Sequence, residues 1–264
     1  MIPKKIHYCW FGGNPLPEET KIYIESWKKY CPDYEIIEWN EKNFDLNCNI
    51  YIQEAYQAKK WAFITDYVRL YVMYNYGGIY MDTDVEVIKS LDPYLNNKAF
   101  SGFETFTDIP TGIMASEKGF PLFKEFLDYY KDRHFIMNDG SYDMTTNVVI
   151  ITNICKKYGL KRNNTKQTIQ GFTLYPSDYF CPKSHTTHKI TLTDNTVTIH
   201  HFAGSWLSGE ARKRTDLLNN LCKRYGYDFG SFLFNTIYLP YRLISNIKEN
   251  GFRKSFNKIV NKKR

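Results

Sequence analysis

The chain lacks the features that mark zinc proteins, disulfide-linked domains and membrane-spanning proteins. Its six cysteines are scattered and contain no Cys-x-x-Cys pair, which excludes the usual structural zinc sites and favours reduced, buried thiols in a cytoplasmic protein. No run of about 20 apolar residues is present, so we expect neither a signal peptide nor a membrane span. Neither internal repeats nor a low-complexity linker divides the chain.

Net charge is absent from most of the chain, although the whole carries a formal charge of +7. Residues 242–264 hold eight Lys or Arg and one Glu, which accounts for all of this excess. The rest offers no electrostatic argument for binding nucleic acid. Its length and its 43% hydrophobic content suit one large domain. We expect a catalytic domain over residues 1–230 and a basic amphipathic extension over residues 231–264.

Strand-like and helix-like segments alternate along the chain. Strands are predicted over 5–10, 34–39 and 79–81, with two more within 99–116. A hairpin is predicted over 189–201, around Asp194-Asn195, and helices over 18–30, 50–59, 61–76, 121–131, 145–158 and 210–225. This alternation predicts an α/β fold with an open, mainly parallel sheet flanked by helices.

The most informative motif is a pair of carboxylates after a short apolar strand. Gly77 and Gly78 end a helical segment, Ile79–Met81 reads as a buried strand, and Asp82 and Asp84 follow. Asp-x-Asp pairs also occur by chance in loops, but side chains two residues apart on an extended backbone point the same way. Two adjacent anions need a positive partner. A hard divalent cation that also contacts phosphate oxygens is the usual one.

Three polar residues on predicted helices are further candidates for substrate contacts. Asp66 and Arg69 are three apart and share a helix face, for which an exposed ion pair is the common explanation. Their helix, however, is rich in apolar residues and leads through two glycines into the Asp-x-Asp strand. They are therefore suited to gripping sugar hydroxyls and a phosphate. Asn147, near a later helix start, is either a substrate contact or a helix-surface residue.

Two strand ends carry other residues suited to ligand binding. Trp10 ends the first predicted strand before two glycines, where its indole either stacks on a nucleobase or packs in the core. His200 and His201 end a later strand ahead of Ser205 and Trp206. Imidazole binds Mn²⁺ well, and an indole N–H can donate to a phosphate oxygen. Because neighbours on a strand face opposite ways, at most one histidine should reach a cation directly.

Four segments in this order resemble the glycosyltransferases with the Asp-x-Asp sugar-binding region, the family 32 type. That group includes yeast α-mannosyltransferases and bacterial capsule enzymes, and it is related to the glucosylating toxins. The matching segments are 2–13, 62–69, 76–84 and 201–206. The resemblance implies a nucleotide-diphosphosugar transferase (GT-A type) fold, a divalent cation (Mn²⁺ or Mg²⁺) and retention of the anomeric configuration.

The resemblance also implies a role for each matching residue. Trp10 would stack on the base of a nucleotide-sugar, with a UDP-sugar the expected donor and GDP-mannose the alternative. Asp66 and Arg69 would bind the donor sugar, and Asp82 the ribose and sugar hydroxyls.

The remaining matching residues are implied to hold the metal and the diphosphate. Asp84 and His201, together with Asp82, would form the metal site. Ser205 and Trp206 would belong to the nucleotide-sugar site, with Trp206 at the diphosphate. We accordingly expect His201 to contribute more to metal affinity than His200.

We therefore expect a metal-dependent, retaining hexosyltransferase that acts on a glycan or glycolipid acceptor in surface polysaccharide synthesis. No carboxylate stands out as an enzymic nucleophile below the sugar ring. A haloacid dehalogenase-type phosphatase also opens with a strand and Asp-x-Asp-x-Val, but the later acidic metal pair of that class is missing from the chain. A non-catalytic sugar-nucleotide binder is the other alternative, and the presence of both carboxylates and Arg69 argues against it.

The C-terminal extension suggests a membrane contact. In residues 231–264, apolar residues recur at near-helical spacing with Lys and Arg between them. Such a segment suits an anionic lipid leaflet, so we expect peripheral attachment at the inner face of the cell membrane. Packing of the apolar stripe on the domain is the alternative.

Overall fold

The computed structural model describes residues 1–104, 108–184, 188–204, 209–226 and 229–238. The chain divides into two compact units: unit 1 comprises residues 1–184 and 190–206, and unit 2 comprises residues 185–189 and 207–264. The predicted domain boundary between residues 230 and 231 lies within unit 2.

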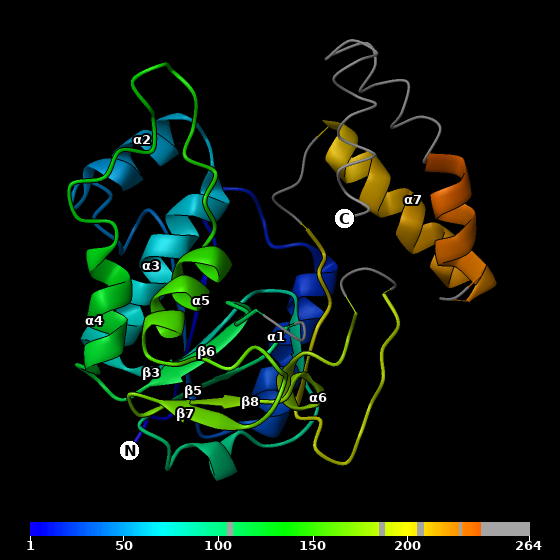
Figure 1. Cartoon of the computed structure of the whole chain (residues 1–264), viewed down its shortest axis with the longest axis horizontal. Coiled ribbons are helices and arrows are strands. Elements are labelled where there is room, and N and C mark those ends of the chain that lie inside the picture. Colours follow the sequence, from blue (N-terminus) through cyan, green and yellow to red (C-terminus); the bar gives the residue numbers. More distant parts are fainter. Residues whose placement is uncertain (105–107, 185–187, 205–208, 227–228, 239–264) are drawn as a thin grey trace. The chain divides into compact units, whose positions relative to one another are not determined.

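Unit 1 is built around a seven-stranded sheet in the order β2-β1-β3-β6-β5-β8-β7 (Figure 1). Five strands run the same way, while β6 and β7 run opposite to them. This topology confirms the predicted α/β fold with an open, mainly parallel sheet. The strands are β1 Lys5–Cys9, β2 Glu35–Trp39, β3 Gly78–Met81, β5 Ala99–Gly102, β6 Ile113–Ser116, β7 Gln167–Ile169 and β8 Phe172–Tyr175.

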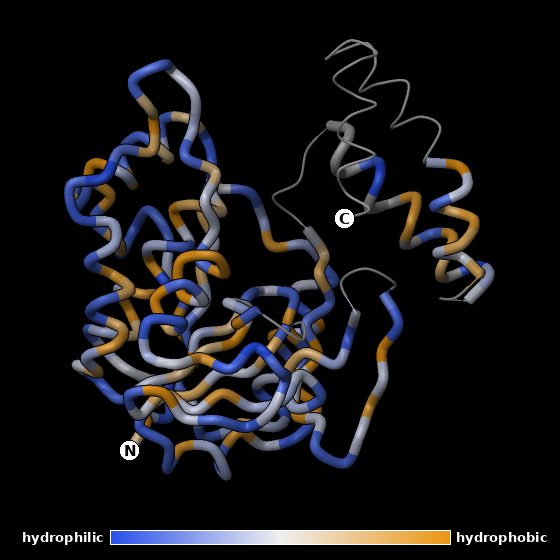
Figure 2. Tube along the Cα trace, viewed as in Figure 1, coloured by the Kyte–Doolittle hydropathy of each residue, from blue (hydrophilic) through white to orange (hydrophobic). Residues whose placement is uncertain are grey.

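Helices cover both faces of this sheet. Successive side chains of a strand point to opposite faces, so they pack into two separate apolar clusters. Tyr80 of β3 joins the larger cluster with α2 to α5, whereas Ile79 and Met81 join the other with α1. The loop between α4 and α5, beyond α2, is largely hydrophilic (Figure 2). The helices are α1 Glu18–Tyr30, α2 Ile50–Gln57, α3 Trp61–Tyr76, α4 Pro121–Asp128, α5 Asn147–Lys157 and the short α6 Ser177–Phe180, with a 3₁₀ turn at Asp92–Tyr94.

Two glycines make the sharp junction between α3 and β3. Gly77 has φ 67° and Gly78 has φ 107°, in the left-handed region that favours glycine. A Cβ at Gly77 would lie 2.6 Å from the Lys118 backbone nitrogen, and one at Gly78 would lie 2.8 Å from the Lys5 carbonyl oxygen. The helix that carries the predicted sugar-binding residues is therefore joined to the Asp-x-Asp strand without a spacer.

The predicted hairpin over 189–201 is wrong. β9 (Thr198–His200) pairs antiparallel with β4 (Val85–Val87), which follows the Asp-x-Asp motif. The segment before β9 is held elsewhere, because Asp178 accepts hydrogen bonds from the Thr193 hydroxyl and the Asn195 amide, at 2.9 and 3.0 Å. The pairing brings the end of β9 to the carboxylates after β3.

His7 of β1 is fully buried and joins three parts of unit 1. The Trp39 indole N–H donates to its Nδ1 at 3.0 Å, so its Nε2 carries the proton and donates to the Gly77 carbonyl at 2.9 Å. Burial lowers the pKa of His7 to about 4, against the opposing effect of the Gly77 carbonyl. The native protein therefore holds this ring neutral.

We predict that His7 makes the protein less stable as the pH falls from about 6.5 to 4. The unfolded chain takes up a proton near the ordinary pKa of about 6.5, whereas the folded protein resists it down to about 4. The contribution is complete above the upper pKa and is lost on acidification, by an amount on the order of 3 kcal/mol. Urea unfolding at several pH values measures it. The loss should shrink in His7→Gln and persist in the exposed control His134→Gln; equal slopes in all three proteins would contradict the prediction.

Unit 2 is described by its helices alone. α7 spans Gly209–Tyr225, and a second helical segment covers residues 229–238. Among the described residues, no helix combines the length and the apolar character needed to span a membrane.

Candidate metal and donor site

Asp82 and Asp84 lie in the turn between β3 and β4, fixed by backbone hydrogen bonds. The Asp82 N–H donates to the Gly112 carbonyl at 2.8 Å, continuing the pairing of β3 with β6. The Ala203 N–H donates to Asp84 Oδ2 at 2.7 Å. Both carboxylates are thus held on ordered backbone at the carboxyl end of β3, where ligands collect in open α/β sheets.

His200 completes a cluster with these two carboxylates. As the last residue of β9, it is paired with Val85, and its Nε2 lies 3.2 Å from Asp84 Oδ1. One ligand atom from each of Asp82, Asp84 and His200 lies within 4.8 Å of the others. Gly112 makes room for the ring, because a Cβ there would lie 2.6 Å from His200 Nδ1.

The cluster fits a divalent cation on two grounds. Two carboxylate oxygens and one imidazole nitrogen suit Mn²⁺, and the carboxylates alone suit Mg²⁺. The second ground is spacing, because His200 Nε2 faces Asp84 and one ligand atom of each of the three residues lies within 4.8 Å of the others. Burial opposes the charge on His200, but Asp84 outweighs it and raises the pKa of the imidazole well above its usual value. The same contact holds the pKa of Asp84 at about 2, against its burial.

The structure places His201 away from the cluster, in contrast to the sequence expectation. Its Nε2 contacts Glu86 Oε2 at 2.9 Å, and its ring stacks on Tyr23 with centroids 4.6 Å apart. Neighbouring strand residues face opposite ways, as expected. The pairing of β9 with β4 turns His200, rather than His201, toward the carboxylates, so the geometry favours His200 as the third ligand.

We predict that His200→Ala lowers Mn²⁺ affinity about tenfold or more, while His201→Ala changes it little. The reason is that only His200 has a ring nitrogen within reach of both carboxylates. Calorimetric titration of the wild type and of each variant with Mn²⁺ measures the three affinities. A larger loss in His201→Ala would restore the assignment made from the sequence.

Asp66, Arg69 and Asp82 form a continuous chain of charges, in which Asp66 and Arg69 are buried and Asp82 is half-buried. An Arg69 guanidinium nitrogen lies 3.3 Å from Asp66 Oδ1 and 3.3 Å from Asp82 Oδ1. Arg69 also donates to the Thr111 carbonyl at 2.7 Å, and its guanidinium lies over the Tyr80 ring. Only 6% of the Arg69 side chain and 10% of the Asp66 side chain are exposed. The structure thus excludes the simple exposed ion pair and connects α3 directly to the Asp-x-Asp carboxylates.

Asn147 is a buried partner of Asp66 rather than a helix-surface residue. It is fully buried at the first position of α5, where its backbone N–H donates to Asp66 Oδ2 at 3.0 Å. Its side-chain amide donates to the Asp66 carbonyl, and its Oδ1 accepts from the Tyr130 hydroxyl at 2.6 Å. Burial raises the pKa of Asp66 to about 6, while Arg69 opposes the rise. Asn147 therefore binds one carboxylate oxygen of Asp66, while Arg69 contacts the other.

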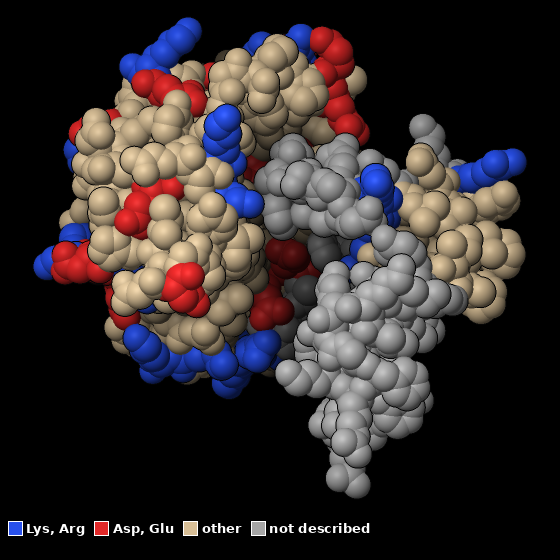
Figure 3. Space-filling model, turned by 90° about the horizontal axis from the view of Figure 1, so that it is seen from above, with Lys and Arg blue, Asp and Glu red and all other residues tan. Residues whose placement is uncertain are grey.

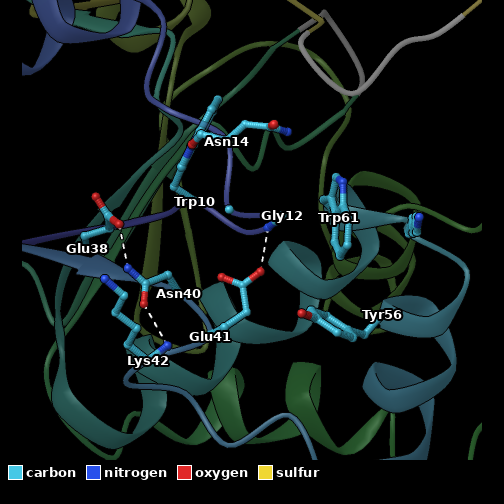
Figure 4. A pocket seen from close by; sticks show the side chains of 11 residues that line it. Trp10, Gly12, Asn14, Glu38, Asn40, Glu41, Lys42, Tyr56 and Trp61 are labelled. Atoms are coloured by element: carbon cyan, nitrogen blue, oxygen red, sulfur yellow. Dashed lines mark hydrogen bonds between the residues drawn. The ribbon is translucent and has the colours of Figure 1, made fainter.

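Trp10 lines a pocket of about 810 Å³ in unit 1. In Figure 4, Trp10 lies on one side, and Trp61 and Tyr56 lie on the other. The Trp10 indole N–H donates to the Asn14 carbonyl at 2.6 Å, and the Gly12 N–H donates to Glu41 Oε1 at 2.6 Å. Aromatic faces with a rim of carboxylates and amides suit a flat ring that carries polar groups. Trp10 is thus a pocket residue, while its contact with a base stays a prediction.

Two predicted site residues, Ser205 and Trp206, lie outside the described residues. Asn147, which was predicted as either a substrate contact or a surface residue, and Gly112, which was not predicted, act in ways that the sequence did not reveal. The motif search had singled out the His200-His201 pair, but choosing between the two needs the strand register. Gly112 carried no signal at all, because its role depends on a ring nearly 90 residues later.

Comparison with known proteins agrees with this site. Residues 17–101, which include Asp66, Arg69 and both Asp-x-Asp carboxylates, match the family described as glycosyltransferase sugar-binding region containing DXD motif. A mannosyl phosphorylinositol ceramide synthase of Saccharomyces cerevisiae is 27% identical over 88% of the chain and 61% of its own length. Inositol phosphoceramide mannosyltransferase 3 of Schizosaccharomyces pombe is 30% identical over 46% of the chain and 35% of its own length. The matches thus span less than two thirds of either relative.

Two solved structures that align with the chain carry glycosyltransferase titles. The apo form of the Streptococcus pneumoniae glycosyltransferase GlyE aligns with a TM-score of 0.47 at 11% identity, over 91% of the chain and 64% of that protein. The galactosyltransferase LgtC, in complex with donor and acceptor sugar analogs, aligns with a TM-score of 0.41 at 16% identity, over 88% and 95%. The match over residues 17–101 therefore identifies this part of the chain as similar to the glycosyltransferase sugar-binding region with the Asp-x-Asp motif.

Proposed function

We propose that the protein is a metal-dependent, retaining hexosyltransferase that uses a nucleotide-diphosphosugar donor. The observation that carries this proposal is the cluster of Asp82, Asp84 and His200, joined through Arg69 to Asp66. A cluster suited to a cation fits the diphosphate of such a donor. The neighbouring Asp66 and Arg69 fit its hydroxyl-rich sugar. The requirement for Mn²⁺ or Mg²⁺ is part of the proposal.

Each group of residues in the site has a different proposed role. Asp82, Asp84 and His200 would hold the cation, which supplies Lewis-acid stabilisation of the diphosphate when bound. Arg69 contacts both Asp82 and Asp66, and the small exposed parts of Asp66 and Arg69 would contact sugar hydroxyls. Trp10 and the pocket beside it would take the nucleoside. Nothing in this set is an enzymic nucleophile, so the leaving diphosphate oxygen is the proposed acceptor of the proton from the incoming hydroxyl.

We propose a chemical class for the donor and for the acceptor. We propose a UDP-sugar because Trp10 matches the position that stacks on uracil in the glucosylating toxins that this chain resembles. The names of the fungal relatives point instead to mannose as the sugar. Those names also place a sphingolipid, inositol phosphoceramide, on the acceptor side. We propose a glycan or lipid-linked acceptor, with surface polysaccharide synthesis as the setting expected from the sequence.

A donor panel tests the proposal. The full-length protein is incubated with UDP-, GDP- and CDP-sugars, with Mn²⁺, Mg²⁺ or EDTA, and hydrolysis of each donor is followed. We expect one nucleotide class to be cleaved, with EDTA abolishing the reaction and the released sugar retaining its anomeric configuration at first formation. Phosphate release from p-nitrophenyl phosphate without donor cleavage would identify a phosphatase. Tight binding without turnover, with or without candidate acceptors, would identify a binding protein.

Trp10→Ala should weaken binding of the preferred nucleotide by roughly 1–3 kcal/mol, the scale of one lost stacking contact on a base. Calorimetry with UDP and GDP in the presence of Mn²⁺ measures the change. Trp10→Phe is the matched control and should retain most of the affinity, because it keeps an aromatic face. Unchanged nucleotide affinity in Trp10→Ala would mean that this indole only lines the pocket.

A further inference from the structure

The helical segment 229–238 of unit 2 has a fixed inner face. Gly230 and Phe234, one helical turn apart, are buried. A Cβ at Gly230 would lie 2.6 Å from the Cα and the nitrogen of Cys222 in α7, so the two backbones are in direct contact. Arg214 of α7 also lies over the Phe234 ring, 5.9 Å from its centroid. Close packing at Gly230 therefore determines which side of the segment faces α7.

This orientation leaves an aromatic cluster, defined as Tyr225, Phe229 and Phe232, on the outside of unit 2. Their exposed fractions are 45%, 55% and 63%, and Ile237 is 54% exposed. Phe229 stacks on Phe232 and meets Tyr225 edge-on, with centroids 6.2 Å apart in both pairs. The rings contact one another rather than the core. Adjoining exposed aromatic rings of this kind mark an interaction surface more often than single exposed residues do.

Charge indicates the chemistry of the partner. Residues 207–264 contain thirteen Lys or Arg and four Asp or Glu, a formal net charge of +9, whereas residues 1–206 carry −2. Within this basic unit, the Arg224 guanidinium lies over the Tyr225 ring at 5.3 Å. In Figure 3 the described part of unit 2, at the right, shows mostly uncharged side chains beside Lys and Arg. A second copy of a unit with this charge would be repelled, and an anionic partner would be attracted.

We propose that unit 2 binds the surface of an anionic lipid bilayer, with the aromatic cluster in the headgroup region. Aromatic side chains are favoured at the boundary between headgroups and acyl chains, and Lys and Arg beside them are attracted to anionic lipids. The proposed contact is peripheral, made by side chains that are exposed on the described surface of unit 2. The inference is independent of the proposed function, because binding is measured without any sugar donor.

Flotation of the full-length protein tests this surface. Vesicles of phosphatidylcholine alone are compared with vesicles that also contain phosphatidylglycerol, at low and high salt. The wild type should float with the anionic vesicles only, and less at high salt. Phe229→Ser/Phe232→Ser should lower the partition coefficient about tenfold or more, because two rings leave the interface. The control Ile22→Ser/Leu192→Ser removes two exposed apolar side chains of unit 1 and should float like the wild type.

Two further measurements keep the result decisive. Circular dichroism establishes that both double variants remain folded, and Lys213→Gln/Arg224→Gln should reduce flotation without touching the exposed phenylalanines. Equal flotation of the wild type and the phenylalanine variant would overturn the proposal. So would a wild-type dimer that the phenylalanine variant dissociates, or binding to an oligonucleotide with no flotation, because either result identifies a different partner for this surface.

Discussion

Replacing Asp84 with asparagine should abolish metal-dependent turnover while the protein remains folded. Asp84 Oδ1 faces His200 within the proposed cation site, whereas Oδ2 accepts the Ala203 N–H. Asparagine can still accept that backbone hydrogen bond, so the turn is kept and only the charge is lost. We expect donor hydrolysis to fall at least about 100-fold, since a charged ligand contributes more than its supporting partners do. The assay is run with the preferred donor across a range of Mn²⁺ concentrations.

Glu86→Gln is the matched control for Asp84→Asn. It removes the same charge two residues along the chain, from a carboxylate that contacts His201 instead of His200. Its turnover should stay within a few-fold of the wild type, and unfolding curves should show that both variants are folded. Near-normal turnover of Asp84→Asn at saturating Mn²⁺ would remove Asp84 from the metal site.

Replacing Arg69 with methionine should cost about 3–5 kcal/mol of the free energy of unfolding, the range for an opened buried ion pair. Arg69 is the cation between Asp66 and Asp82, and it also bonds the Thr111 carbonyl. Methionine fills much of the volume but leaves both carboxylates without their counter-charge. Urea unfolding at neutral pH measures the loss.

Two comparisons separate this effect from a general loss of arginine. Arg162→Met breaks an ion pair with Asp108 in which the two side chains are 40% and 35% exposed, and it should cost no more than about 1 kcal/mol. Adding Asp66→Asn to Arg69→Met should recover part of the stability, because it removes one of the uncompensated charges. An Arg69→Met protein as stable as Arg162→Met would show that the ion pairs of Arg69 with Asp66 and Asp82 do not stabilise the fold.

The helices and strands around the Asp-x-Asp motif were predictable because local signals agree there. α1 spans Glu18–Tyr30 as expected, with acids in its first turn and lysines in its last. α3 ends at Tyr76, where the two glycines meet neighbouring backbone too closely for any side chain. The two carboxylates follow at the end of a fully buried strand. In each case the residues that determine the element lie within a few positions of it.

Features that depend on distant residues were not predictable. Asp194-Asn195 looks like a hairpin turn, but Asp178 holds it and β9 pairs with β4 instead. The choice between His200 and His201 follows from that pairing, and no local pattern reveals it. Asn147 looked like a surface residue because its burial depends on Tyr130 and on Asp66, which is 81 positions away. Tertiary contacts decide such cases, and a single sequence does not display them.

In the loop between α4 and α5, residues 137–146 are held on both sides by carboxylates from other helices. Glu54 of α2 accepts the N–H groups of Phe135 and Ile136 at 2.7 and 2.9 Å, and Asp66 of α3 accepts the N–H of Asn147 at 3.0 Å. The residues between these two attachments are mostly exposed. Loop length costs little free energy when both ends are held. We therefore expect insertions at the exposed tip, residues 138–140, to leave Asp66 in place, so that this segment can change in length while the site keeps its geometry.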